Sequence, residues 1–588
     1  MSATGKVKGL IANLVMIEPE GAVRQNEICF LETAGDWLMG EVIKIEGDTI
    51  YVQIYDSTRG VRIGDKVTFT GSMLEVTLGP GMLSRKYDGL QSDLDELEGT
   101  FLQRGQRSDA LDMNRNWDFK PLMKTGEEVV AGAWLGVVEE NGLPHRIMAP
   151  FDLKGHARLL EMAAQGTYKV TDTIATIELE NGERQPLTMI NKWPSKLAMK
   201  AYKQKLRPFK LLETGIRTID TLHPMLEGGT GFIPGPFGCG KTVLQQAIAK
   251  QAKADVVIVA ACGERANEVV EIFTEFPELD DPSTGRKLIE RTIIIANTSS
   301  MPVAAREASV YTAMTIGEYY RSMGLRVLLL VDSTSRWAQA LREMSNRLEE
   351  LPGPDAFPMD LTAVISSFYA RAGYVTLNND EQGSITFIGT VSPAGGNLKE
   401  PVTEATKKAA RCFYALEQRR ADSKRYPAVD PIDSYSKYLE YPEFQSYASS
   451  SVGKDWISNA LEIKNVMLRG KEAADQINIL GDDGVSIDFH VEFWKSEMLD
   501  FILLQQDAFD DVDMFTPIHR QAFMSSFLLD ISRRNYTFNH FSEVRPFFRK
   551  LINTLKQLNY AEVGSDAYEK LLEEAKELSE LNVEVSNI

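Results

Sequence analysis

The spacing of apolar positions changes along the chain and separates parts with different expected structures. Residues 1–74 contain short runs in which apolar and polar residues alternate, such as Gly40–Ile45 and Thr49–Ile54, with turn signals between them. Such alternation is typical of half-buried strands. Because a closed barrel protects the edges of many short strands, we expect an N-terminal β-barrel that serves assembly rather than chemistry.

A second β-rich part covers residues 112–190, where glycines recur between strand-like runs such as Glu128–Val138. We expect a compact β-rich domain inserted in a loop of the surrounding chain. It carries His145 and His156, which form no metal-binding pair. We therefore expect both to be ordinary residues of the strand surface.

Between about residues 210 and 400, buried-strand patterns alternate with helical ones, which is typical of a mostly parallel sheet. The expected strands are Val256–Ala260, Thr292–Ala296, Val327–Val331 and Ile385–Ile388, and a helix is expected at Val303–Arg321. Beyond about residue 440 the apolar spacing is helical, as in Ala460–Met467, Phe523–Leu529 and Tyr568–Leu581. The chain is thus expected to be multidomain α/β. Its parts are a barrel at 1–74, a core at 75–111 and 191–440, the insertion at 112–190 and a helical domain at 441–588.

The clearest chemical signal is the run from Gly235 to Thr242, which fits the pattern G-x-x-x-x-G-K-[ST] between a short apolar strand and a helical pattern. Glycines let successive backbone N–H groups point at phosphate oxygens, and the next helix aims its positive end there. In that geometry Lys241 reaches the β- and γ-phosphates and the Thr242 hydroxyl ligates Mg²⁺. The core is therefore predicted to be a P-loop, RecA-like α/β nucleotide-binding domain. The expected phosphate-loop contacts are Gly235, Pro236, Phe237, Gly238, Cys239, Gly240, Lys241, Thr242 and Val243.

Two expected strands end in acids, where ligands bind in open α/β sheets. Asp332 ends the run Arg326–Asp332 and is a candidate Mg²⁺ ligand, with a helix-capping role as the alternative. Glu264 follows the strand at 256–260 and is a candidate for aligning the attacking water, with Arg265 to hold it or to offset phosphate charge. The alternative for Glu264 and Arg265 is a surface ion pair.

Charge and cysteine content narrow the function. The formal net charge of -19 argues against free nucleic acid or anionic lipid as the main partner. The 4 cysteines lack metal-ligand spacing, which favours reduced thiols and a cytoplasmic location. With no apolar run of the ~18 residues that span a bilayer, any membrane role is expected to go through partner subunits. Cys239, at a helix start beside Lys241, is expected to have a lowered pKa and a reactive thiol, with an inert thiol that merely fits as a small side chain as the alternative.

Four motifs together resemble the catalytic A subunit of V-type and archaeal-type rotary ATPases. They are the phosphate loop, Gly263-Glu264-Arg265-x-x-Glu268, Asn297–Glu307 and Asp332–Ala338. Residues 75–90, the insertion, Ser392–Gly396 and the helical C-terminus look like the same subunit, so the resemblance covers essentially the whole chain.

This resemblance implies an alternating head of three A and three B-type non-catalytic subunits around a central stalk, with ATP bound mainly on A. Peripheral-stalk subunits and a membrane sector that moves H⁺ or Na⁺ are the other implied partners. It places the head in the cytoplasm, at the membrane periphery. It also implies catalytic roles for Lys241, Glu264 and Arg265, and Mg²⁺ at Thr242 and Asp332. Finally, it implies an adenine pocket with Tyr426, Gln505 and Phe509; without the resemblance, both aromatic residues are expected in the core.

Three positions depart from the family pattern: Pro236 in the loop, Ala266 after Arg265, and Ala370. Pro236 removes one backbone N–H from the phosphate nest. Two other functions compete with the catalytic one. A non-catalytic nucleotide-binding subunit of the same head is disfavoured by the intact Lys241 and Glu264. A hexameric export-type or nucleic-acid translocase ATPase is disfavoured by the insertion, the helical C-terminus and the acidic charge.

Overall fold

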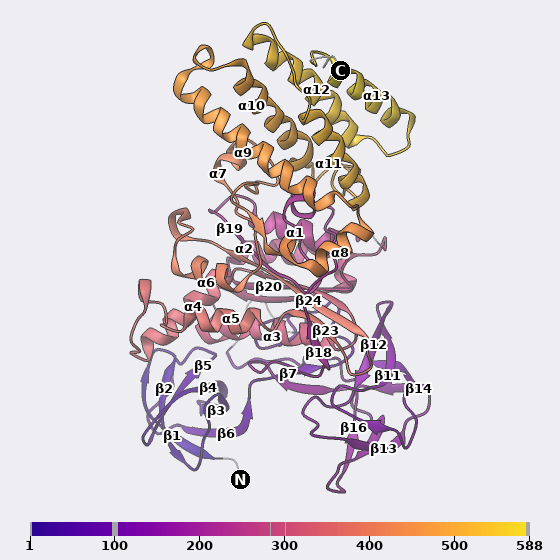
Figure 1. Cartoon of the computed structure of the whole chain (residues 1–588). Coiled ribbons are helices and arrows are strands. Elements are labelled where there is room, and N and C mark those ends of the chain that lie inside the picture. The colour runs from indigo at the N-terminus through magenta and orange to yellow at the C-terminus, as the bar shows by residue number, and fades with distance from the viewer. Residues whose placement is uncertain (1–2, 97–103, 283, 300, 584–588) are drawn as a thin grey trace. The chain divides into compact units, whose positions relative to one another are not determined.

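The computed structural model describes residues 3–96, 104–282, 284–299 and 301–583 (Figure 1). The chain forms two compact units, each assembled from several segments. Unit 1 consists of Met1–Leu206, Ala254–Val391 and Pro401–Ala409, and unit 2 of Arg207–Lys253, Ser392–Glu400 and Ala410–Ile588.

Unit 1 begins with a closed antiparallel barrel, as the alternating pattern predicted (Figure 1). Its strand order is β1-β2-β5-β4-β3-β6. The strands are β1 (Thr4–Ile11), β2 (Leu14–Glu20), β3 (Glu27–Thr33), β4 (Asp36–Glu46), β5 (Thr49–Ile54) and β6 (Lys66–Met73). Alternate residues such as Val15, Ile17 and Val52 fill the barrel.

The insertion contains two four-stranded antiparallel sheets around an apolar core that includes Phe119, Leu135 and Leu159. One has the order β10 (Glu128–Val129), β13 (Ala157–Met162), β15 (Ala175–Glu178), β16 (Arg184–Leu187). The other has the order β12 (Leu143–Met148), β11 (Trp134–Glu140), β9 (Asn116–Pro121), β14 (Gly166–Lys169). A short ladder of β7 (Glu75–Leu78) with β17 (Asn191–Pro194) joins the chain before and after the insertion.

The surface location expected for His145 is wrong, because the residue is only 1% exposed. Its Nδ1 lies 2.6 Å from Glu140 Oε2, and its Nε2 lies 2.9 Å from the Tyr319 hydroxyl. The insertion packs on a helix of the core at this point, so its strand face is covered there. His156 is exposed and pairs with Glu128 at 2.6 Å, in agreement with the expectation.

A parallel sheet forms the core of unit 1, in the order β8-β21-β20-β22-β24, and β23 and β18 extend it antiparallel. The strands are β8 (Lys86–Tyr87), β18 (Gln204–Leu206), β20 (Val256–Glu264), β21 (Thr292–Thr298), β22 (Arg326–Asp332), β23 (Gly373–Thr376) and β24 (Gln382–Val391). Its helices are α2 (Ala266–Thr274), α3 (Val303–Arg321), α4 (Thr334–Arg347), α5 (Leu361–Tyr369) and α6 (Pro401–Ala409). All four expected strands are present and longer than predicted, since polar residues at their ends still pair in the ladder.

Unit 2 combines a small strand group with a helical bundle. Strand β19 (Thr230–Pro234) runs parallel to β25 (Cys412–Phe413), which pairs antiparallel with β26 (Tyr435–Ser436). The helices are α1 (Lys241–Gln251), α7 (Gln418–Asp422), α8 (Pro442–Ser451), α9 (Trp456–Leu480), α10 (Ile487–Leu499), α11 (Ile518–Ser532), α12 (Phe541–Tyr560) and α13 (Asp566–Glu580). Their apolar faces meet in one core that includes Ile463, Leu528 and Phe548.

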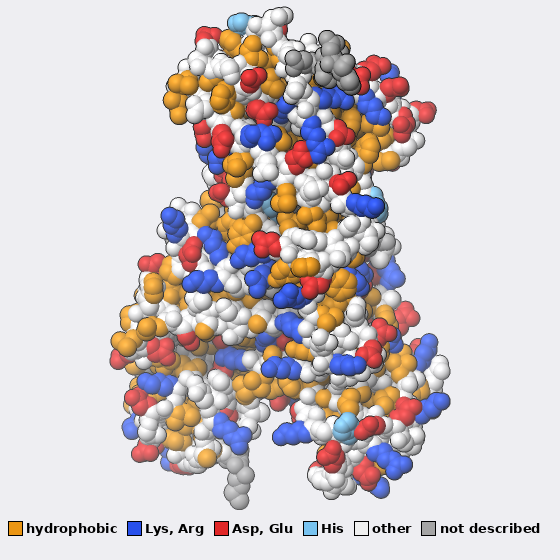
Figure 2. Space-filling view, in the orientation of Figure 1, with side chains coloured by type: hydrophobic (Ala, Val, Ile, Leu, Met, Phe, Trp, Pro, Cys, Tyr) orange, Lys and Arg blue, Asp and Glu red, His pale blue; other side chains and the backbone are white. Residues whose placement is uncertain are grey.

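Acidic and basic side chains are interspersed on the visible face of each unit (Figure 2). Among the described residues, no helix is both long enough and apolar enough to cross a bilayer.

Candidate functional site

The phosphate loop connects β19 to α1 in unit 2, in the strand–loop–helix order that the sequence predicted. Gly238 and Gly240 have φ values of 84° and 85°, a left-handed conformation that suits glycine. Gly240 is the N-cap of α1. The loop therefore ends where the first backbone N–H groups of the helix lack intrahelical acceptors.

Lys241 is the first residue of α1 and is 9% exposed. Its Nζ donates hydrogen bonds to the carbonyls of Gly235, at 2.9 Å, and Pro236, at 2.8 Å. The ammonium therefore lies across the loop, next to the N-terminus of α1. Pro236 has no N–H to offer a phosphate, but its carbonyl helps to hold this cation.

The lowered pKa expected for Cys239 is wrong. Burial raises the pKa of the thiol and Asp422 adds to the rise, although Lys241 opposes both. The side chain is 1% exposed, and its Sγ donates to Gln418 Oε1 at 3.0 Å. Burial therefore outweighs the effect of the neighbouring Lys241 cation on this thiol. All four cysteines are free thiols.

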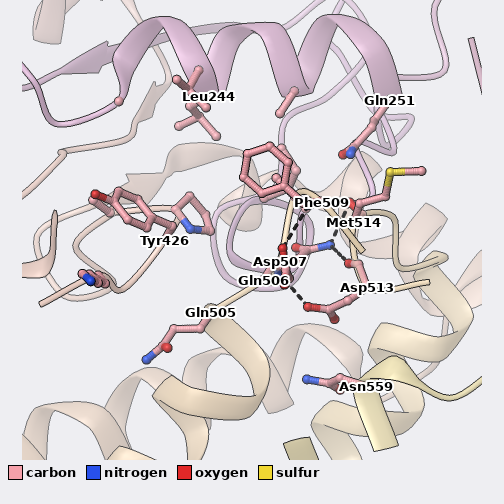
Figure 3. Close-up of a pocket in the computed structure, with 18 of the residues that line it drawn as sticks. Leu244, Gln251, Tyr426, Gln505, Gln506, Asp507, Phe509, Asp513, Met514 and Asn559 are labelled. Atoms are coloured by element: carbon pink, nitrogen blue, oxygen red, sulfur yellow. Dashed lines mark hydrogen bonds between the residues drawn. The ribbon is translucent and has the colours of Figure 1, made fainter. Parts of the chain in front are cut away.

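A cavity of about 530 Å³ lies within unit 2, between α1 and the loop that follows α10 (Figure 3). Val243 and Leu244 of α1 line one side of it, and Tyr426, Gln505 and Phe509 line the rest together with neighbouring residues. Phe509 is 96% exposed and Tyr426 is 48% exposed, so both contradict the interpretation of them as core residues. Two aromatic rings beside a phosphate loop can stack on a planar base.

Two acids of unit 1 lie at the carboxyl edge of its sheet. Glu264 ends β20 and Asp332 ends β22, and these strands pair in parallel so that Ala261 is opposite Asp332. Asp332 is 6% exposed and accepts a hydrogen bond from Thr390 Oγ1 at 2.6 Å. The N-cap of α4 is Ser333, so Asp332 belongs to the strand rather than to the helix cap.

The surroundings of Glu264 favour its protonated form. Burial, the Asp332 charge and a hydrogen bond with Glu268 together raise the pKa of Glu264 to about 8, although the Arg336 charge opposes the rise. A carboxyl with such a pKa holds or releases a proton near neutral pH, as general acid–base catalysis requires. Arg265, next to Glu264, is exposed and is the N-cap of α2.

Three further residues near this edge were not predicted to belong to the site. Thr390 comes from a segment far along the chain from Glu264, and Arg336 lies within the motif Asp332–Ala338 but was not assigned a role there. Arg306, on α3, is 8% exposed, and its Nε has no partner among the described residues. Ser300, part of one quoted motif, lies outside the described residues.

Three family models match the chain in order. Residues 11–71 match the ATP synthase alpha/beta family beta-barrel domain. Residues 108–196 match the barrel-sandwich domain of the ATP synthase alpha/beta subunits, and residues 215–436 match the family's nucleotide-binding domain.

Curated relatives match over almost the full length. A V-type ATP synthase alpha chain of Borrelia duttonii (strain Ly) is 49% identical over 576 residues, 97% of both chains. The chain belongs to the V-type ATP synthase alpha chain family. A relative of the same name from Treponema denticola is 47% identical over 567 residues, 96% of this chain and 94% of its own. Family membership therefore extends over the barrel, the insertion, the core and the helical C-terminus, as the motifs predicted.

Proposed function

We propose that this chain is the catalytic subunit of a rotary V-type ATP synthase or ATPase. Turnover of ATP on it drives, or is driven by, rotation of a central stalk and transport of H⁺ or Na⁺ through membrane subunits. The observation that carries this proposal is the combination of a complete phosphate loop with a half-buried acid whose pKa is raised to about 8. A non-catalytic nucleotide-binding subunit would not need such an acid.

Unit 2 binds the nucleotide in this proposal. The phosphates lie on the loop, where Lys241 exchanges its contacts with the Gly235 and Pro236 carbonyls for phosphate oxygens. The adenine stacks between Tyr426 and Phe509, with Gln505 at its edge. Exposed rings are available for stacking without disturbing the core.

The side chains suit Mg²⁺ as the cofactor of the nucleotide. The Asp332 charge raises the pKa of Glu264, so the two carboxylates repel each other when both are ionised. A bound cation would reduce that repulsion. The described residues contain no cluster of three or more His, Cys, Asp or Glu side chains for a metal. This suits Mg²⁺, which is usually held by one or two side chains together with phosphates and waters. Thr242 and Asp332 are the proposed protein ligands, and the ion would neutralise phosphate charge.

Unit 1 supplies the hydrolytic chemistry in this proposal. Glu264 orients a water and accepts its proton during attack on the γ-phosphorus, and returns it during synthesis. Glu268 and Asp332 favour the protonated acid, and so make Glu264 a stronger base once it is ionised. Arg265 offsets phosphate charge at the start of α2.

The proposed partners are a B-type non-catalytic subunit, alternating with this chain in a hexamer of three copies each, and central- and peripheral-stalk subunits. The complex would lie in the cytoplasm, with its head peripheral to the membrane and no role for nucleic acid. We propose 1–74, 75–111 with 191–440, 112–190 and 441–588 as its domains.

Co-expression with a B-type subunit tests the proposal. A mixed hexamer with Mg²⁺-dependent ATP turnover, lost in Lys241→Ala, is the expected result. A ring of this chain alone with full activity would favour an export-type ATPase. A mixed hexamer whose turnover survives Lys241→Ala would make this chain the non-catalytic subunit.

A further inference from the structure

Arg217 is a buried cation of unit 2 for which the proposed chemistry has no use. The residue is 2% exposed and lies in the segment before β19. Its guanidinium donates to the Asp513 carboxylate, the Thr516 hydroxyl and the carbonyls of Leu503 and Gln505. All four acceptors belong to the segment that carries Phe509. One side chain therefore ties the phosphate-loop part of unit 2 to the loop with the exposed aromatic ring.

Asp513 extends this contact toward Phe509. One of its carboxylate oxygens accepts from Arg217, and the other accepts from the Asp507 N–H at 2.7 Å. The Asp507 carboxylate in turn accepts from the Phe509 N–H at 2.9 Å. Figure 3 shows Asp507, Phe509 and Asp513 beside the pocket, with dashed lines for the hydrogen bonds that join Asp507 to Asp513 and Phe509 to Asp507. A continuous series of hydrogen bonds thus runs from the guanidinium to the Phe509 backbone.

Gln506 connects Arg217 to the other ring. Its Oε1 accepts from the backbone N–H of Arg217 at 2.9 Å, and its Nε2 donates to the Gly215 carbonyl at 2.8 Å. Its own backbone N–H donates to the Tyr426 carbonyl at 2.9 Å. Both aromatic residues of the pocket are therefore held, through the backbone, by the segment that contains Arg217.

That segment is itself held by hydrogen bonds to a buried carboxylate. The buried Asp220 carboxylate accepts from the N–H and hydroxyl of Thr214, from the Gly215 N–H and from Gln521 Nε2. Gly215 has a φ of 71°, and a Cβ there would lie 2.0 Å from the Phe515 ring. Glycine is thus required for the close approach of the two segments, which leaves Arg217 on a fixed support.

We propose that Arg217 is a positioning residue for base recognition, which fixes the gap between Tyr426 and Phe509 into which the base inserts. This inference rests on the proposed function, because it presumes that the base binds at these rings. A guanidinium suits the role because its planar group donates hydrogen bonds to several acceptors at once in a fixed geometry. A lysine would keep the charge opposite Asp513 but has no fork to reach the carbonyls as well.

The test is Arg217→Lys in the full-length chain, with calorimetric dissociation constants for Mg-ATP and for Mg-tripolyphosphate, which has no base. Losing the base stack should weaken ATP binding by at least ~5-fold, the lower end of the range for stacking on aromatic side chains. Tripolyphosphate binding should change by less than about twofold, the scatter expected for an uncoupled site. Equal weakening of both ligands would show a general structural role and overturn the proposal.

A double-mutant cycle with Phe509→Ala adds a second criterion. If Arg217 acts through Phe509, Arg217→Lys should cost little further ATP affinity when the ring is already absent. Full additivity of the two losses would also overturn the proposal. Should Arg217→Lys fail to fold by circular dichroism, Thr516→Val decides instead, since it removes one acceptor and keeps the ion pair with Asp513. It should give a smaller loss that is again confined to ATP, and an unchanged ATP constant would refute the role.

Phe509→Ala alone separates this inference from the function on which it rests. An unchanged ATP affinity in that variant would show that the base does not bind at the rings. Weakened ATP binding in Phe509→Ala, with none in Arg217→Lys, would contradict only the role of Arg217.

Discussion

Replacement of Glu264 by Gln examines the proposed chemistry most directly. The variant keeps the size and hydrogen-bonding capacity of the side chain but cannot accept the proton of water. Removal of a general base typically lowers a rate by ~10²–10⁴-fold, so turnover of the assembled complex should fall by about that factor. Mg-ATP binding should change little, because the phosphate loop and the base pocket are built from unit 2 alone. Parallel losses in binding and turnover would instead assign Glu264 a structural role.

The raised pKa of Glu264 adds a test on the metal-free chain. Its native value of about 8 lies above the ordinary 4.5, so the native state binds this proton more tightly than the unfolded state does. The stability from the protonated acid is fully present below pH 4.5 and is lost as the pH rises toward about 8. Each tenfold change in proton affinity is worth ~1.4 kcal/mol, so the loss in the free energy of unfolding is at most roughly 5 kcal/mol.

The assay is denaturant unfolding of the wild type and of Glu264→Gln at several pH values between 5 and 9. Because the amide does not titrate, the wild type should lose stability relative to the variant across this range. Glu268→Gln serves as the matched control, because it removes one of the neighbours that raise the pKa of Glu264. This variant should still lose stability as the pH rises, but the loss should occur at lower pH than in the wild type. Equal pH dependence in wild type and Glu264→Gln would refute the reasoning.

Three further predictions concern binding, assembly and the metal. Phe509→Ala should weaken ATP binding about 5- to 150-fold in calorimetry; because the ring is 96% exposed, the thermal midpoint without nucleotide should not change. Phe489→Ala, also exposed but outside the pocket, is its control and should alter neither quantity. The isolated chain should turn over ATP at least ~10³-fold more slowly than the mixed hexamer, since the arginine that phosphoryl transfer requires is expected from the B-type subunit; full activity of the monomer in a steady-state assay would contradict this. Asp332→Asn should raise the Mg²⁺ concentration needed for half-maximal turnover, and an unchanged requirement would remove Asp332 from the metal site.

Local patterns predicted the elements of this fold well. The strand before the phosphate loop, the helix Val303–Arg321 and the closed barrel all follow from periodicity within a few neighbouring residues. The family resemblance, carried by four motifs, is confirmed by relatives that match nearly the whole chain.

The errors arose where distant segments decide a residue's surroundings. His145 has the sequence context of a surface strand, yet α3 covers it. Cys239 has the context of an activated thiol, yet Gln418, far along the chain, shields it. Phe509 is a large apolar residue of the kind usually found in a core, yet its side chain is exposed on a loop. In each case the exposure or reactivity that the local sequence suggests differs from what the folded chain shows. Contacts between distant segments cannot be read from the pattern of neighbouring residues.

The ladder of β7 with β17 gives the insertion a narrow base, because four residue pairs bring together two points far apart in the sequence. Once this base is closed, the length of chain beyond it has little influence on stability. The entropy of loop closure rises only with the logarithm of length, about 0.6 kcal/mol for each doubling. The insertion can therefore grow, shrink or acquire new surfaces during evolution while the sheet that carries Glu264 and Asp332 keeps its register. Differences in chain length among relatives should accordingly be concentrated within residues 112–190, since β8 (Lys86–Tyr87) before them belongs to the core sheet.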